Sequence, residues 1–270
     1  MKNLIGITLL TYFCCTSASL SHEVWLDADE FQVETSETLT AELKNGQNFV
    51  GGGLIYNPRS FTRFEVLSTD GLRPVPGTIG DRPALSLSDQ PAGLQVIGYE
   101  STVSTLTYKE WEKFQAFADH KDFPDIKTRH DARGLPETDF VEAYTRHVKM
   151  LACVGSCDGQ DAIMGLETEL VALANPYQLA PNAPLPVQLL LNGAPQPDRQ
   201  IEIFARAADE TVQITTTRTN ENGVADIMLQ PDTTYLLDAV TLRVPSTERH
   251  VKTNAVWDTL WAALTFQTPE

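Results

Sequence analysis

The stretch that decides the fold class is "QIEIFARAADETVQITTTRTNENGVADI", residues 200–227. Apolar and polar residues alternate along much of it, which is the period of β-strands that bury one face. It also contains Asn222-Gly223, the dipeptide that most strongly favours a two-residue hairpin turn. Similar runs on both sides recur about every ten residues, a spacing typical of β-sandwiches. The sequence therefore predicts a small β-sandwich at the carboxy-terminal end.

Alternating apolar residues also run from residue 24 to about residue 106. They include "FTRFEVL" (61–67) and "GLQVIGYES" (93–101). The intervening "VGGG" (50–53) predicts a glycine loop, because the lysine and serine of a phosphate-binding loop do not follow it. The amino-terminal part of the chain is therefore predicted to be β as well.

Residues 107–155 predict a helical insert. "YKEWEKFQAFADH" (108–120) has apolar residues at helical spacing. In "PETDFVEAYTRHVKML" (136–151), Thr138 or Asp139 can cap a second helix. One face of that helix carries Phe140, Tyr144, His147, Val148 and Leu151. The segment between the two helices reads as a mobile loop.

A proline-rich seam, "ANPYQLAPNAPLP" (174–186), marks a boundary between two domains. We therefore expect an amino-terminal β domain over 22–174, with the helical insert at 107–155, and a carboxy-terminal β-sandwich domain over 175–270. The predicted fold class is mainly β, with two β-sandwich-like domains and a helical insert.

The first 21 residues have the pattern of a secretory signal peptide: Lys2, the apolar run at 4–15, then small residues. The run is too short to span a bilayer and no later segment is long enough, so we expect a periplasmic protein that is not membrane-embedded. The small residues allow cleavage after Ala18, Ser19 or Ser21. Removal of Lys2 changes the formal net charge from −16 to −17, which disfavours binding to nucleic acid or anionic lipid.

Two cysteines remain after residue 21, Cys153 and Cys157 in "CVGSC". In an oxidising compartment this spacing favours a disulfide, with Gly155 ending the preceding element. Metal binding by the two thiolates is the alternative.

The signal cleavage site decides what His22 can do. A cut after Ser19 leaves Leu20-Ser21-His22, whose amine, amides and imidazole can wrap a square-planar Cu(II) or Ni(II) ion. A cut after Ser21 makes His22 the first residue, so its amine and ring form a chelate that needs one further histidine to become a copper-binding histidine brace. Otherwise His22 is an exposed residue on a fraying terminus.

The remaining histidines are candidates for the second ligand: His120, His130, His147 and, less favoured, His250. His147 lies on the apolar face of the second predicted helix, where a packed core histidine is the competing interpretation. The run "DADE" (27–30) could hold calcium, but it lacks the spacing of an EF-hand loop. Three tryptophans, Trp25, Trp257 and Trp261, fit a core better than a ligand cleft.

Five motifs together resemble a family of secreted proteins of unknown function: "SHEVWL", "EAYTRHVKML", "GLETELVALANPYQL", "TNENGVADI" and "VWDTLWAALTF". Its members are often described as periplasmic components of nickel or cobalt uptake systems. The resemblance covers nearly all of the chain after residue 21. It implies a mature terminus at or next to the histidine of a His-x-x-Trp motif, here His22 and Trp25. It also implies an immunoglobulin-like or transthyretin-like carboxy-terminal domain.

Three features depart from the pattern of that family. His147 stands where an aromatic residue is common, Pro231-Asp232 replaces Pro-Gly, and the cysteine pair is not a family feature. The resemblance therefore names no second metal ligand.

The sequence predicts a non-catalytic protein that binds nickel, cobalt or copper ions through His22 and delivers them to a membrane or TonB-type outer-membrane transporter. A nucleophile elbow and a His-Glu-x-x-His helix are both missing from the sequence, which disfavours the common hydrolytic mechanisms. Two alternatives stay open: a scaffold module that binds a partner without metal, and a copper oxygenase built on a histidine brace.

Overall fold

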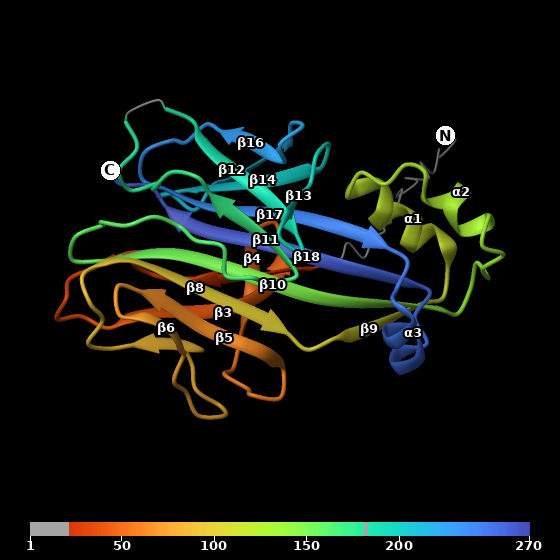
Figure 1. Cartoon of the computed structure of the whole chain (residues 1–270), viewed down its shortest axis with the longest axis horizontal. Helices are drawn as coiled ribbons and strands as arrows, with labels where there is room; N and C mark the ends of the chain where they lie inside the picture. The colour runs from red at the N-terminus through yellow and green to blue at the C-terminus, as the bar shows by residue number, and fades with distance from the viewer. Residues whose placement is uncertain (1–21, 181–182) are drawn as a thin grey trace, which may run out of the picture.

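The protein is mainly β, as expected, with three short helices among the residues that the structure describes. A computed structural model describes residues 22–180 and 183–270. The predicted signal peptide, residues 1–21, lies outside the described residues. Two sandwich-like halves and a small helical insert make up the fold (Figure 1).

A ten-stranded sheet runs through the centre of the molecule and belongs to both halves. Its main path contains, in spatial order, β15 (Val212–Arg218), β14 (Gln200–Ala207), β17 (Thr233–Arg243), β18 (Trp257–Gln267), β10 (Phe140–Val154), β8 (Gly93–Ser101), β5 (Phe61–Ser68) and β6 (Gly71–Pro74). Two further strands, β2 (Gln32–Val33) and β9 (Ser104–Tyr108), pair with β10. The long strand β10 therefore lies at the middle of the fold.

The two halves are joined by the parallel pairing of β10 with β18. The register runs from Glu142 opposite Trp257 to Met150 opposite Thr265. All other neighbours along the main path pair antiparallel. These two strands are far apart in the sequence, and their pairing joins the two halves in one continuous sheet.

Two smaller sheets cover the central sheet. One contains β1 (Glu23–Asp27), β3 (Leu39–Gln47), β4 (Val50–Leu54) and β7 (Leu85–Leu87). The other contains β11 (Thr168–Ala172), β12 (Leu185–Leu191), β13 (Ala194–Pro195) and β16 (Val224–Ile227). Strand β10 serves both cores, since Val148 and Met150 pack under the first sheet whereas Leu151 and Cys153 face the second. The expected division at residues 174 and 175 stays a prediction.

The helices α1 (Trp111–His120) and α2 (Ile126–Asp131) form the insert, and α3 (Thr247–Thr253) precedes β18. Stacked aromatic rings fix α1 on the central sheet, with Phe114 against Trp257 and Phe117 against Trp261. The insert thus places the end of α1 beside strands β14, β17 and β18.

The prediction of a second helix over 136–151 is wrong, because this segment is the 15-residue strand β10. It is buried on both faces, so apolar residues occupy consecutive positions and the two-residue alternation of a strand is lost. The remaining pattern mimics helical spacing. The short helix α2 lies instead in the segment predicted to be a loop.

Two turn predictions are also wrong. "VGGG" is part of strand β4, and a Cβ atom at Gly51 would lie 2.8 Å from the indole of Trp25, so close packing explains the glycine. Asn222-Gly223 forms a turn, with Gly223 at a φ of 71°. However, β15 pairs with β14 and β16 pairs with β12, so this turn crosses between sheets instead of closing a hairpin.

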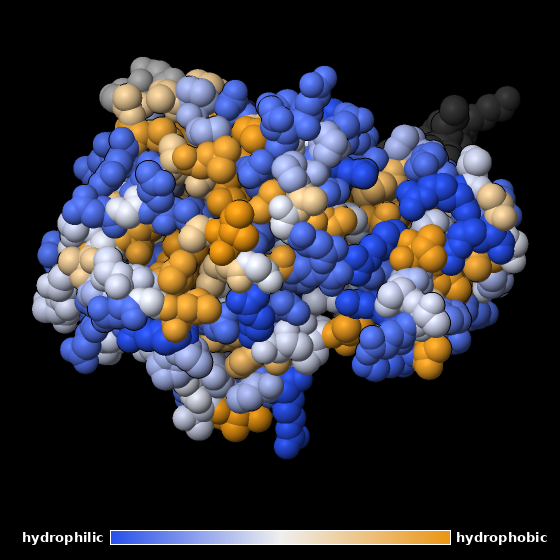
Figure 2. Space-filling model, in the orientation of Figure 1, coloured by the Kyte–Doolittle hydropathy of each residue, from blue (hydrophilic) through white to orange (hydrophobic). Residues whose placement is uncertain are grey.

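Across 22–180 and 183–270, every helix is too short or too polar to cross a membrane. On the face drawn in Figure 2, exposed apolar residues lie in small groups on both halves of the view and are interspersed with hydrophilic ones.

Candidate metal site at the start of strand β1

His22 is exposed and directly precedes β1, the strand that lies over the central sheet. It borders a pocket of about 330 Å³ whose wall also includes Tyr99, Glu142, Tyr144 and Arg146. The strand keeps its position because it pairs with β3, with Glu23 opposite Gly46. His22 is therefore at the mouth of a hollow that contains both charges and phenols.

Three carboxylates from three strands converge in the interior, and one of them belongs to Glu23, the residue after His22. Glu23 of β1, Glu202 of β14 and Asp238 of β17 each offer an oxygen atom, and these atoms lie within 4.8 Å of one another. Their side chains are at most 4% exposed. We call these residues and Lys121 the acid cluster.

Lys121 lies inside this cluster. Its Nζ is 3.3 Å from Glu23 Oε1 and 2.9 Å from Asp238 Oδ2, and it also contacts Glu202. Two cations contact the ring of Trp261: Lys121 Nζ lies 4.8 Å and Arg146 Cζ 3.8 Å from the ring centroid. Two positive charges therefore lie on one indole ring next to three acids.

Burial and the neighbouring charges together shift the pKa of each member of the cluster. Burial, together with the Asp238 carboxylate, raises the pKa of Glu23 to about 7, although Lys121 opposes the rise. Burial would lower the pKa of Lys121, but the three carboxylates raise it overall, so this side chain stays charged. In the part of the chain that the structure describes, Glu23 Oε2 has no hydrogen-bond partner. The cluster therefore has more acceptor capacity than its lysine satisfies.

His120 lies at the edge of the same cluster. It is the last residue of α1, its side chain is 40% exposed, and its Nε2 lies 3.0 Å from Glu202 Oε1. Because Glu202 is close to Glu23, His120 lies at the edge of the cluster that contains Glu23, the residue after His22. Of the candidate second ligands, His120 is the one placed in this cluster.

His130 lies in the interior of the helical insert. Its Nδ1 accepts a hydrogen bond from Trp257 Nε1 at 3.0 Å, and its Nε2 lies 3.0 Å from the Pro136 carbonyl oxygen. Burial lowers its pKa. Both ring nitrogens already have partners, so His130 acts as a packing residue.

His147 is buried in β10 and is directed away from the pocket that His22 borders. It follows Arg146, and consecutive residues of a strand point to opposite faces. Its Nδ1 lies 3.3 Å from the Trp261 carbonyl oxygen, and burial lowers its pKa to about 4. His250 is on α3, with Nδ1 2.7 Å from the Ala255 carbonyl oxygen.

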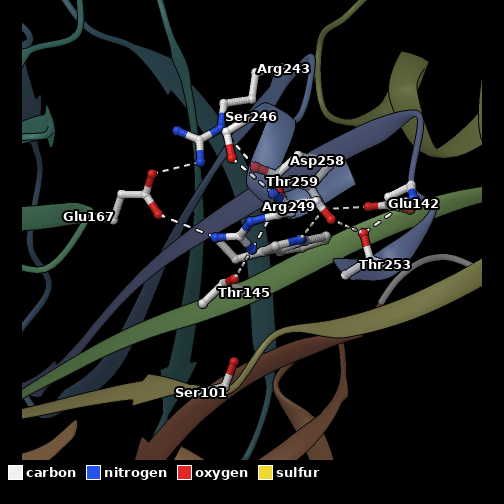
Figure 3. A network of polar contacts seen from close by, with 12 residues as sticks. Ser101, Glu142, Thr145, Glu167, Arg243, Ser246, Arg249, Thr253, Asp258 and Thr259 are labelled. Carbon is white, nitrogen blue, oxygen red and sulfur yellow. Dashed lines mark hydrogen bonds and ion pairs between the residues drawn. The ribbon is translucent and has the colours of Figure 1, made fainter. Parts of the chain in front are cut away.

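A second polar network connects α3, β18 and the segment before β11 (Figure 3). Glu167 contacts Arg243 at 2.6 Å and Arg249 at 3.7 Å. The buried Asp258 lies 2.8 Å from Arg243 and 3.3 Å from Arg249. Acids and arginines alternate through this network, which indicates that it holds the structure together.

In the "DADE" segment, Asp27 is also part of an ion-pair group. It lies 2.9 Å from Lys44 and 2.8 Å from Arg206. Burial opposes the shift, but hydrogen bonds from Arg206 and Lys44 lower the pKa of Asp27. Lys44 and Arg206 thus already pair with the carboxylate that a calcium ion would need as a ligand. Trp25, Trp257 and Trp261 are all buried in hydrophobic cores.

Sequence reasoning missed Glu23, Lys121, Glu202 and Asp238 as functional candidates. A signal was present for two of them: Glu202 in "QIEIF" and Asp238 in "LLDAV" are charged residues inside otherwise apolar strands.

The fold and the site together define a mainly β protein with a buried acid cluster, one member of which, Glu23, follows an exposed histidine in the sequence. Residues 19–243 match the family described as "Domain of unknown function (DUF4198)", and the chain belongs to that family. The expected membership of a domain-of-unknown-function family is thereby confirmed. The match carries no association with nickel or cobalt.

Comparison with curated proteins finds no match. One similar solved structure is a tetra-tandem repeat in the extending region of a large adhesion protein, 11% identical with a TM-score of 0.23. The alignment covers 90% of this chain and 49% of that chain, so this chain spans about half of its length. Another is the D0-D1 domain of intimin, 10% identical with a TM-score of 0.21, covering 89% of this chain and 96% of that chain.

Proposed function

We propose that the protein is exported to the periplasm, where it binds a divalent transition-metal ion, nickel, cobalt or copper, through His22 and passes it to a membrane or TonB-type outer-membrane transporter. One observation carries the proposal. His22 directly precedes Glu23 in the sequence, and Glu23 belongs to a buried cluster in which three carboxylates face one lysine, with His120 at the edge.

The donor set fits such an ion. Imidazole suits nickel, copper and cobalt, and carboxylates can complete the coordination. A cut after Ser21 adds the amine of His22 to its imidazole. His120 can turn to a metal ion because its side chain is 40% exposed and its contact with Glu202 lies at the cluster's edge. The raised pKa of Glu23 means that a bound cation displaces a proton there near neutral pH.

We propose capture and delivery rather than catalysis. Lys121 and Arg146 already place two positive charges beside the acids, which limits how tightly the cluster holds a further cation. A protein that must release its metal to a transporter needs such a moderate affinity. An oxygenase, by contrast, keeps its copper.

The test uses protein exported by its own signal sequence. Intact mass gives the amino-terminal residue, and the same sample, stripped with a chelator, is titrated with Ni(II), Co(II) and Cu(II) by calorimetry. We expect a terminus at His22 or Leu20 and tight binding of one ion per chain. His22→Ala should abolish binding, whereas His250→Ala, an exposed histidine on α3, should not.

A terminus at Ser19, or no tight binding of any of the three ions, would overturn the proposal. The metal-free scaffold would then be the leading interpretation. Oxygen consumption by the copper-loaded protein that disappears in His22→Ala would replace delivery by catalysis.

A further inference from the structure

A second buried lysine, Lys149 of β10, lies between the central sheet and the sheet that contains β11. Its side chain is 1% exposed, and its Nζ lies 2.7 Å from Asp161 Oδ1. The side chain of Asp161 is 0% exposed. A second carboxylate, Glu169 of β11, is 3.7 Å from the same nitrogen and is 1% exposed. An amine, a carboxyl group and a second acid therefore meet in the interior.

From this geometry we infer that Lys149 and Asp161 condense to an intramolecular amide bond, with Glu169 as the proton carrier. The bond would tie β10 to the segment that leads into β11. This is a modification of the chain by its own side chains, and it is independent of the metal proposal.

The contact between the two groups suits the first step. In that step one proton moves from Lys149 Nζ to Asp161 across the 2.7 Å contact, which gives a neutral amine and a neutral acid. A desolvated, neutral lysine is a nucleophile. The 2.7 Å contact holds the two groups together, which replaces a bimolecular encounter by a reaction within one molecule.

The surrounding hydrogen bonds suit the reaction. Asp161 Oδ2 accepts a hydrogen bond from the amide of Ala172 at 2.8 Å, and Oδ1 accepts one from Ala162 at 2.7 Å. These N–H groups can stabilise negative charge on the carboxyl oxygen as the amine attacks. Glu169 is itself held by the amides of Met164 and Gly165, at 2.9 and 3.0 Å. Its position beside Nζ is therefore fixed.

The steps balance without a further reactant. The lone pair of the Lys149 amine forms a bond to Asp161 Cγ, and the carbonyl electron pair moves to oxygen. Glu169 takes a proton from the nitrogen and returns it to the hydroxyl group of the carboxyl carbon. That hydroxyl leaves as water and the carbonyl re-forms. Overall, one ammonium and one carboxylate become one amide and one water molecule.

The bond would reinforce a segment that already carries one crosslink. Cys153, near the end of β10, is joined to Cys157 in a disulfide with 5.0 Å between the Cα atoms. Asp161 follows four residues later and, through its hydrogen bond to Ala172, already touches both sheets. A covalent amide would make this link between the sheets permanent.

The test is the intact mass of the full exported chain, unfolded and with its disulfide reduced. We expect a mass lower than that of the sequence, counted from the observed terminus, by one water molecule. A proteolytic digest should contain a branched peptide that joins Lys149 to Asp161. Lys149→Arg and Glu169→Gln should restore the full mass, whereas Lys252→Arg, at an exposed position on α3, should keep the loss.

The wild-type measurement does not depend on any variant folding. A wild-type mass equal to that of the sequence overturns the inference. A water loss that persists in Lys149→Arg also overturns it, since Asp158-Gly159 could lose water by forming a cyclic imide. Treatment with hydroxylamine separates the two cases, because it opens an imide and leaves the amide crosslink intact.

Discussion

Two buried lysines of this protein, Lys149 and Lys121, lie among carboxylates. Comparing their surroundings distinguishes a group that stabilises the fold from one proposed to bind a metal ion. Around Lys149 there are two acids, Asp161 and Glu169, and each also accepts hydrogen bonds from backbone amides. Around Lys121 there are three acids, and one oxygen of Glu23 has no partner within the described residues. The first group is internally satisfied, whereas the second is not.

The difference follows from where the two groups lie. The Lys149 group is enclosed between two sheets, where an unpaired charge is costly. The acid cluster is also buried, but His120, whose side chain is 40% exposed, contacts Glu202 at its edge and connects it to solvent. A closed and satisfied ion group holds sheets together. An open group with excess acid can exchange a proton for a cation.

The largest expected effect is in the enclosed group. Lys149→Met removes the amine that contacts Asp161 and Glu169 and leaves both carboxyl groups buried without it, so it should lower the free energy of unfolding by about 3–5 kcal/mol. Guanidinium denaturation measures it. Lys252→Met removes only the exposed pair with Glu248 and should change stability by less than about 0.5 kcal/mol. Equal effects of the two substitutions would contradict the comparison.

A smaller effect, which depends on pH, is expected in the acid cluster. The pKa of Glu23 is raised to about 7 from an ordinary value of 4.5, so the folded chain holds this proton more tightly than the unfolded chain. Its contribution to stability is therefore complete below about 4.5 and is lost as the pH rises through about 7. Glu23→Gln removes this loss, on the order of 3 kcal/mol.

The measurement is urea denaturation of both proteins across that pH interval in buffer that contains a chelator. The wild type should lose stability between the two pKa values, and Glu23→Gln should lose less. Identical slopes for the two proteins would show that Glu23 ionises in the folded chain as it does in the unfolded one.

Metal binding should also depend on whether Glu23 is protonated. Because a cation competes with the proton on Glu23, the affinity for Ni(II) should rise with pH up to about 7. Calorimetry in buffers of different ionisation enthalpy counts the protons released, and Glu23→Gln should release fewer than the wild type. A count that Glu23→Gln leaves unchanged would remove Glu23 from the proposed site.

Local patterns in the sequence were enough to predict most of the strands and the first helix of the insert. They could not predict β10 correctly, because a strand buried on both faces has no alternation to detect. The pairing of β10 with β18 was also out of reach, since it joins residues more than a hundred positions apart. Periodicity describes one segment at a time and contains no information on which segments meet.

The candidate site was predictable in part for the same reason. His22 was singled out from the signal-peptide pattern, and His120 from its residue type alone. Glu202 and Asp238 stand out in their strands as charged residues in apolar surroundings. Nothing in either strand indicates that both meet Glu23 around Lys121, because that contact arises only when β1 lies over the central sheet.

The smallest expected effect separates a ligand from a structural residue. His120 touches Glu202, but its side chain is 40% exposed, so His120→Gln should lower the stability of the metal-free protein by less than about 1 kcal/mol. If His120 is the second ligand, the same substitution should still weaken Ni(II) or Cu(II) binding at least tenfold, measured by calorimetry. A large loss of stability with unchanged metal affinity would instead make His120 a partner of Glu202 only. The acid cluster would then be as closed a structural group as the one around Lys149.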